Sequence, residues 1–268
     1  MPYRSRLSRL LTSGFMPMLL LFRQRFLILQ LVKRDIVSRT SGTWLGSLWL
    51  LGQPALQVLA FWFLLDVVFK VRAVGHIAYL DYFLTAMLPW LLISDSLTRS
   101  LHILGEFGAL YQRSRFPVAV LPLLPPLLSL VVYLPIYLMV VGGLLGGVAS
   151  LKALLIMLSL FIWVIPLVYG LAITGLFVRE VRQVFPFLIT MALYVTPILY
   201  APDSLPASAR WMLAWNPIAD IIALIQGWLH GFPIEQGNWL RPLLIWLGLS
   251  GPAWILFQRT EPHMREVL

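Results

Sequence analysis

Acidic side chains within long apolar stretches are the first residues in this sequence that could do chemistry. Asp66, Asp81 and Asp95 each lie in or beside such a stretch. Ionisable groups are costly inside a bilayer and are usually retained there for proton transfer or ion binding. Asp66 precedes Lys70 by four residues. Asp95 precedes Arg99 by the same spacing, and this acid-first order favours an ion pair on one helix face. We therefore expect structural ion pairs at these two acids and an interfacial position for Asp81, rather than a proton relay.

The sequence contains no motif for metal, thiol or nucleotide chemistry. The four histidines are scattered, and none has a metal-ligand spacing such as H-E-x-x-H. There is no cysteine, which excludes disulfides, thiolate ligands and a catalytic thiol. No G-x-x-x-x-G-K-[ST] loop is present, and no lysine follows a glycine. The sequence therefore predicts no metal site, no cofactor held by this chain and no ATP hydrolysis by a phosphate loop of its own.

Tyrosines within apolar stretches form a second set of candidates. Tyr133 and Tyr137 are one helical turn apart, and Tyr169 and Tyr194 lie inside two later stretches. A hydroxyl in hydrocarbon needs a hydrogen-bond partner, so these rings should face a bundle interior or a wet passage rather than lipid. Ordinary helix packing and the aromatic lining of a passage both explain them.

Composition identifies the bilayer as the solvent of the elements that carry these residues. Hydrophobic residues make up 60% of the 268 positions and charged residues only 12%, roughly half the charged share of a soluble domain. The net charge of +9 comes from 20 Lys and Arg against 11 acids. No basic helix or stacked-aromatic motif accompanies these charges, so nucleic-acid binding is not indicated and membrane topology is the better explanation.

Six stretches are long and apolar enough, or nearly so, to cross a bilayer, which takes about 20 residues. They are 43–69, 77–97, 116–149, 153–178, 185–200 and 242–257. Four early prolines make the start of the third stretch irregular, so we place its span at 127–149.

The segment 201–241, between the fifth and sixth spans, is predicted to be an extracytoplasmic cap or a re-entrant pair of short helices. Its apolar part, 211–230, contains Pro217, and the residue before a proline is pushed out of helical geometry. A seventh span over 211–230 is the alternative.

The distribution of Lys and Arg predicts that both termini are cytoplasmic. With six spans, fifteen of these residues fall on the inner face and five on the outer, in line with the positive charge of short cytoplasmic loops. A seventh span would weaken this asymmetry. The predicted fold is an all-α membrane protein with a basic interfacial segment over 1–40, six transmembrane helices over 41–257 and a cytoplasmic tail over 258–268.

Several short motifs follow one another between about residues 31 and 257. They are Lys33-Arg34-Asp35, Trp44 to Trp49 with Pro54, Leu88-Pro89-Trp90, Arg115-Phe116-Pro117, Leu121-Pro122, Arg179-Glu180, Thr196 to Tyr200, Leu205-Pro206 and Asn216-Pro217. Their order and spacing, with the six-span topology, resemble the permease subunits of type-2 ABC exporters that move lipid-linked polysaccharides such as O-antigen, capsule and teichoic-acid precursors. Glu180 is a departure, because the family more often has aspartate there.

The resemblance implies a homodimer in the bacterial inner membrane that binds two copies of a cytoplasmic ATP-binding subunit, which would hold the ATP and Mg²⁺. It places an ATPase-coupling helix in the first cytoplasmic loop, 101–115, where a solvated loop is the alternative. The coupling candidates are Glu106, Phe107, Tyr111, Arg113 and Arg115.

The resemblance also implies a channel at the dimer interface, lined by aromatic rings that stack on sugars. Under this reading Tyr133, Tyr137, Tyr169 and Tyr194 line the passage, and Trp211, Asn216 and Pro217 belong to a periplasmic gate. Arg25, Lys33 and Arg34 would contact the pyrophosphate of the lipid carrier, although positive-inside topology explains these three as well.

Three other functions compete with this one. The same exporter fold could carry a drug or a small lipid. A gradient-driven secondary transporter should show unpaired acids in mid-membrane and two repeated halves with broken helices, and neither is evident. A membrane-embedded transferase or hydrolase would need a matched set of catalytic groups, which the sequence does not offer.

Overall fold

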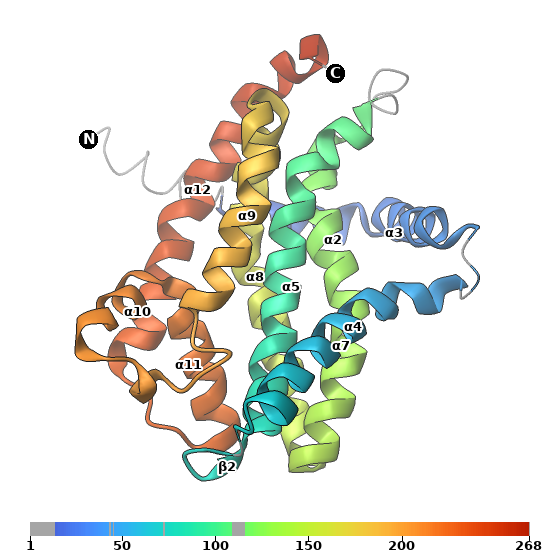
Figure 1. The fold of residues 1–268 in the computed structure, drawn as a ribbon. Helices are drawn as coiled ribbons and strands as arrows, with labels where there is room; N and C mark the ends of the chain where they lie inside the picture. The colour runs from blue at the N-terminus through green and yellow to red at the C-terminus, as the bar shows by residue number, and fades with distance from the viewer. Residues whose placement is uncertain (1–13, 43, 45, 72, 109–115, 268) are drawn as a thin grey trace, which may run out of the picture.

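Helices carry most of the chain that the computed structural model describes, which is residues 14–42, 44, 46–71, 73–108 and 116–267 (Figure 1). The α-helices are α2 (Met16–Arg23), α3 (Arg25–Thr40), α4 (Trp49–Trp62), α5 (Tyr79–Glu106), α7 (Leu124–Leu145), α8 (Gly147–Phe177), α9 (Arg179–Val195), α10 (Trp211–Trp215), α11 (Pro217–His230) and α12 (Gln236–Val267). A π-helix, Phe63–Val68, continues α4, and short 3-10 turns cover Gly46–Leu48, Val118–Leu123, Pro202–Ser204 and Ala207–Ala209. The strands β1 (Ala73–Val74) and β2 (Ile77–Ala78) form a small antiparallel hairpin.

Within the described residues, four helical stretches are long and apolar enough to cross a membrane. They are Trp49–Val68, Val118–Leu145, Gly147–Phe177 and Asn238–Met264. A pair of helices over 207–215 and 217–230, bent by 95° at the break between them, would make a fifth span if the pair crosses as one. The all-α membrane class is therefore confirmed, with four or five candidate spans.

The remaining two predicted spans, 77–97 and 185–200, correspond to α5 and α9. Helix α5 carries Asp81, Asp95, Arg99 and Glu106, so its apolar character is diluted. It lies in the middle of the bundle and packs against α7, α8, α9 and α11. A helix covered by other helices needs no apolar surface toward lipid, which explains how α5 holds these charges.

The start of α7 agrees with the predicted irregular turn. A 3-10 turn over Val118–Leu123 precedes the helix, which begins at Leu124 rather than Leu127. Pro125 and Pro126 fit the first helical turn because backbone N–H groups have no intrahelical partner there.

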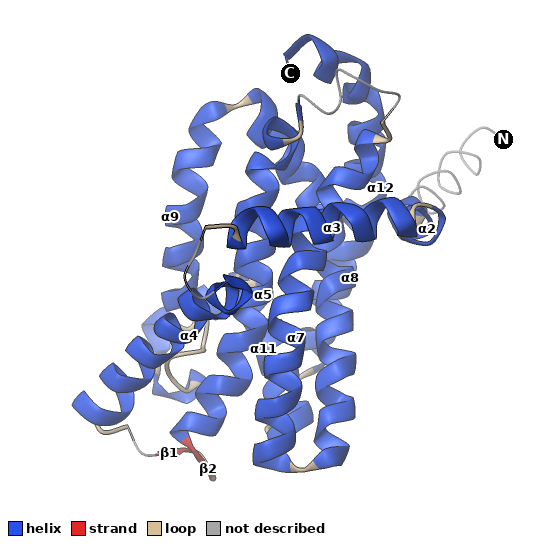
Figure 2. Ribbon diagram, turned by 90° about the vertical axis from the view of Figure 1, so that its right-hand side faces the viewer, coloured by secondary structure: helices blue, strands red, loops and turns tan. Residues whose placement is uncertain are grey.

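Helix α3 runs across the long helices instead of along them (Figure 2). It packs on α7 and is joined to α4 through a short 3-10 turn. Arg25, Lys33, Arg34 and Arg39 give it a basic character.

Of the two predicted acid–base pairs, only one forms. The Arg99 guanidinium lies 2.5 Å from Asp95, one helical turn away on α5. No ion pair joins Asp66 to Lys70 among the described side chains, so this prediction was wrong. The π-helix around Asp66 changes the number of residues per turn, and Lys70 has left the helix with a φ of 54°.

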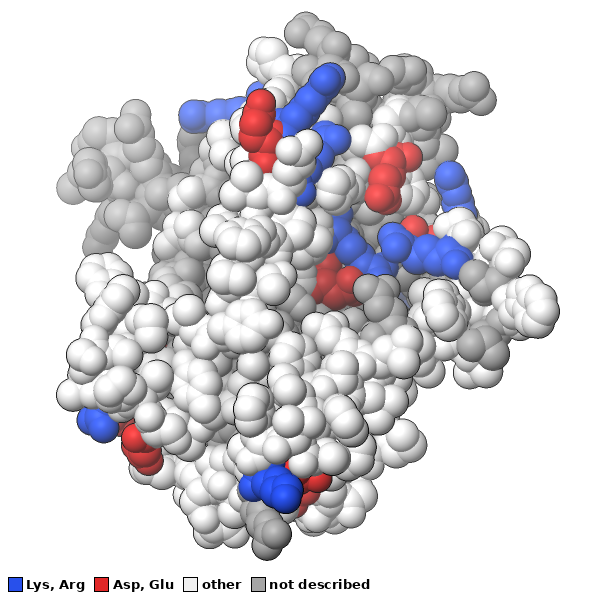
Figure 3. Space-filling view, in the orientation of Figure 1, with Lys and Arg blue, Asp and Glu red and all other residues white. Residues whose placement is uncertain are grey.

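Charged side chains gather toward one end of the face shown in Figure 3, with fewer at the other end. The crowded end is the one where α5 and α12 finish, and the other holds the β-hairpin. Between them lies a broad belt of uncharged side chains, such as a protein embedded in hydrocarbon presents.

Candidate functional site

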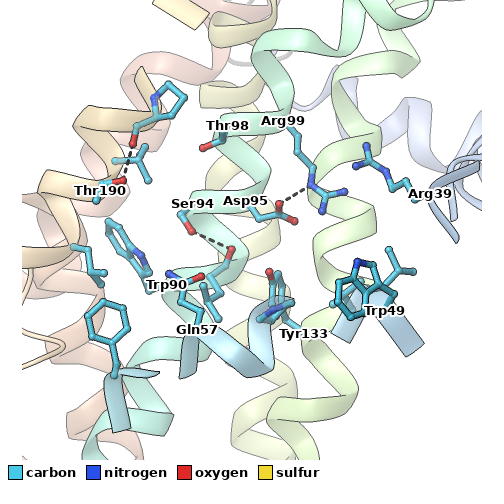
Figure 4. Close-up of a pocket in the computed structure, with 18 of the residues that line it drawn as sticks. Arg39, Trp49, Gln57, Trp90, Ser94, Asp95, Thr98, Arg99, Tyr133 and Thr190 are labelled. Carbon is cyan, nitrogen blue, oxygen red and sulfur yellow. Dashed lines mark hydrogen bonds and ion pairs between the residues drawn. The ribbon is translucent and has the colours of Figure 1, made fainter. Parts of the chain in front are cut away.

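A cleft of about 590 Å³ opens between α3, α4, α5, α7 and α9. Its walls are rich in aromatic rings: Trp49, Phe61, Trp90, Tyr133 and Tyr194 (Figure 4). Polar groups such as Gln57, Ser94 and Thr98 lie between the rings. Flat rings with interspersed hydrogen-bonding groups suit a ligand that has both C–H faces and hydroxyls.

A charged cluster lies at one end of this cleft. Arg99 Nε donates to Asp95 Oδ1 at 2.5 Å, and the second oxygen of Asp95 accepts from Ser129 Oγ at 2.7 Å. Arg39, at the end of α3, also lines the cleft and donates to Asp35 Oδ2 at 2.5 Å. Both carboxylates are therefore held by hydrogen bonds, and two arginines face the cavity.

The four tyrosines predicted to line a passage fall into two groups. Tyr133 and Tyr194 line the cleft, and Tyr194 is 51% exposed. Tyr137 is fully buried and donates to the Thr85 carbonyl at 3.1 Å, while Tyr169 donates to the Ala119 carbonyl at 2.5 Å. The latter two hydroxyls tie helices together, as ordinary packing of buried tyrosines would, and neither ring lines the cleft.

Two of the three predicted gate residues, Asn216 and Pro217, lie at a sharp bend. Asn216 is the N-cap of α11, where its side chain accepts from Ile218 N–H at 3.0 Å, and Pro217 is the first residue of that helix. The Asn216 amide also donates to Thr196 Oγ1 at 2.9 Å, which ties the bend to the end of α9. Trp211 begins α10 and is 63% exposed. The predicted pair of short helices is thus present, and it lines part of a second cavity of about 470 Å³.

The predicted ATPase-coupling residues are only partly within the described chain. Glu106 ends α5 and is exposed, whereas Phe107 is buried with the Arg34 guanidinium 5.5 Å from its ring centroid. Tyr111, Arg113 and Arg115 lie outside the described residues.

The three predicted pyrophosphate contacts lie on α3 but not in the cleft. The Arg25 guanidinium lies 5.0 Å from the Phe26 ring centroid, Arg34 covers Phe107, and Lys33 is exposed. Arg39 and Arg99 do line the cleft, whereas the sequence indicates only a topological charge for Arg39 and an ion pair for Arg99. Only the packing of α3 against the bundle brings them together, so no sequence pattern could have found this site.

Among the described residues, no three His, Cys, Asp or Glu side chains come together in a way that could hold a metal ion. The arrangement offers a polar, aromatic-walled space for binding and passage.

The sequence is similar to curated export permeases. It is 26% identical over 210 residues to the O-antigen export system permease protein RfbA of Klebsiella pneumoniae, an alignment that covers 73% of this chain and 77% of that protein. It is 28% identical over 244 residues to the protein of the same name from Myxococcus xanthus, covering 86% of this chain and 92% of the other. No protein-family model matches the chain.

Proposed function

We propose that this chain, a distant homologue of these O-antigen export permeases, is the transmembrane subunit of an ATP-driven exporter that carries lipid-linked polysaccharide across the bacterial inner membrane. The observation that carries the proposal is the aromatic cleft within a bundle of membrane-length helices. The chain is a multi-pass permease and not an ATPase, in agreement with the relatives it matches.

In the proposed topology, α5 and α9 cross the membrane beside the four apolar spans, which gives six crossings with both termini in the cytoplasm. The charge-rich end of the molecule would then be cytoplasmic, as the excess of basic residues in short inner loops requires. Helix α3 would lie in the inner interface, because it runs across the bundle and is basic. Helices α10 and α11 would form the cap or gate on the outer side.

The partners in this proposal are a second copy of the chain and two copies of a cytoplasmic ATP-binding subunit, which holds the ATP and Mg²⁺. The exposed Glu106 at the end of α5 is a suitable contact for that subunit. Phe107 links the same end to α3 through the Arg34 guanidinium. A displacement of the end of α5 would therefore be transmitted both to the interfacial helix α3 and to the cleft.

The cleft has the chemistry that passage of a glycan requires. Rings such as Trp90, Tyr133 and Tyr194 can stack on sugar C–H faces without selecting one pattern of hydroxyls. The second copy of the chain would close the cleft into a channel. Closure of the ATPase pair would shift the population from a closed to an open arrangement of this channel.

Deletion of the gene in its native strain tests this function. We expect surface polysaccharide to disappear while the lipid-linked glycan accumulates on the cytoplasmic side, and the wild-type gene should restore export. Normal surface polysaccharide in the deletion strain would refute the proposal. If the glycan is unaffected but a drug or small lipid is retained, the exporter carries a different cargo.

A further inference from the structure

Two arginines from different elements line one end of the cleft. Arg39 belongs to the last turn of α3 and Arg99 to α5, and both line the same cavity. Figure 4 shows the two side chains extending into the same part of the cleft, with Trp49 and Tyr133 on the side away from α5's end.

Each guanidinium is held by one nitrogen only. Asp35 and Asp95 accept from Nε of Arg39 and Arg99 respectively, each at 2.5 Å. Among the described residues, no further protein hydrogen bond engages the terminal nitrogens of either arginine. About a third of each arginine side chain is exposed, 33% and 29%. The carboxylates therefore orient the two guanidinium groups and leave their terminal nitrogens available to a ligand.

Two other described arginines are engaged differently. Arg241 uses both terminal nitrogens, one on the Ala214 carbonyl and one on Asp220. The guanidinium of Arg34 covers the ring of Phe107. Arg39 and Arg99 are thus two oriented guanidinium groups that share a cavity and have unused donors.

The surroundings of the pair fit a lipid headgroup. Arg99 lies two turns before the end of α5 at Glu106, about 10 Å along the helix axis, and shares its cavity with Arg39 of α3. Apolar side chains on both sides of the cleft are exposed: Leu56 and Leu59 on α4, and Phe187 and Met191 on α9. A lipid chain can lie along these faces while its headgroup reaches the arginines.

We propose that Arg39 and Arg99 together bind the phosphate or diphosphate group of a lipid at the charged end of the cleft. Guanidinium forks bind phosphate oxygens through pairs of charge-assisted hydrogen bonds. Because Asp35 and Asp95 balance the two positive charges, binding depends on directed hydrogen bonds more than on net charge. The proposal rests on the proposed function only for the identity of the lipid, which would be the carrier of the exported glycan.

Binding to the purified full-length chain in lipid nanodiscs tests the site. The probes are an isoprenyl diphosphate, the matching isoprenyl alcohol and phosphatidylglycerol. Arg39→Gln and Arg99→Gln should each weaken diphosphate binding about tenfold or more and leave the alcohol unaffected. Arg99→Lys keeps the charge but loses the fork, so it should also bind more weakly. Arg23→Gln, which removes a charge from the exposed end of α2, should bind as wild type does, and thermal melting shows whether each variant is folded.

Unchanged diphosphate binding in folded Arg39→Gln and Arg99→Gln variants would overturn the site. If the variants lose binding of the isoprenyl diphosphate alone, the site binds the substrate lipid. If they lose binding of phosphatidylglycerol to the same extent, the site binds a phospholipid of the bilayer. The assay needs neither ATP nor export. Normal export after gene deletion would thus refute the proposed function alone, and intact lipid binding by the variants would refute the phosphate site alone.

Discussion

Arg241 and Asp220 form an ion pair of 2.9 Å that joins the start of α12 to the first turn of α11. The same guanidinium donates to the carbonyl of Ala214 in α10, so it connects both helices of the bent pair. Asp220 is buried, and its second oxygen has no hydrogen-bond partner among the described residues. Arg241 is therefore the group that compensates this carboxylate and holds the bend in place.

Replacing Arg241 by Ala should loosen the cap over 201–241. The change leaves a buried carboxylate unpaired and frees a helix-end carbonyl, at a cost of about 2 kcal/mol. Hydrogen exchange should rise in α10 and α11 and stay unchanged in α7 and α8. Arg210→Ala, at an exposed position on the same cavity, is the control. Equal exchange in the two variants would contradict this role of Arg241.

Gly175 should tolerate no side chain, because α5 and α8 touch there. A Cβ at this position would overlap the backbone of Leu101. Gly175→Ala should therefore lower the thermal unfolding midpoint, at a cost of about 1–3 kcal/mol or more. Gly170 lies on the same helix with nothing within 4 Å of a built Cβ, so Gly170→Ala is a matched control that should be neutral or slightly stabilising. A normal midpoint for Gly175→Ala would show that the two helices are less closely packed.

Glu106→Ala should uncouple ATP hydrolysis from export. The exposed carboxylate at the end of α5 is a proposed contact of the ATP-binding subunit, so its loss should leave ATPase activity and assembly intact while export falls. Glu180→Ala removes an exposed carboxylate at the start of α9 and serves as the control. Full export by Glu106→Ala would remove this residue from the coupling contact.

Single cysteines test the proposed topology cleanly, since the chain has none of its own. Ser208→Cys in the cap should react with a membrane-impermeant maleimide in intact spheroplasts. Gln183→Cys at the start of α9 and His263→Cys near the end of α12 should react only after permeabilisation. All three positions are exposed. Labelling of His263→Cys from outside would instead indicate that the bent helix pair crosses the membrane.

Residue spacing and proline positions in the sequence predicted the helices well, but they did not predict which residues line the cleft. Pro217 fixed the break between α10 and α11, and the four-residue spacing predicted the Asp95–Arg99 pair, because both depend on neighbours within one segment. The Asp66–Lys70 pair failed because a π-helix altered the local geometry. Tyr133 and Tyr137 lie one turn apart on α7 and have identical side chains, yet only Tyr133 lines the cleft. The positions of α4 and α9, which are distant in the sequence, decide which of the two rings lines the cleft.

The cleft aromatics should be needed for export but not for folding. Tyr194→Ala removes a half-exposed ring from the cleft, so we expect export to fall several-fold with an unchanged unfolding midpoint. Phe22→Ala, at an exposed ring on α2 outside the cleft, is the control. Equal export by both variants would argue that the passage lies elsewhere.

The central claim is tested most directly by transport in proteoliposomes that contain this chain, its ATP-binding subunit and a lipid-linked glycan in the outer leaflet. In vesicles where the ATP-binding subunit faces outward, added ATP should move the glycan into the lumen, where an external lectin no longer reaches it. Vesicles without ATP, or with an ATPase-dead partner, should show no loss of lectin binding. If the glycan stays accessible although ATP is hydrolysed, this chain is not the permease for lipid-linked polysaccharide.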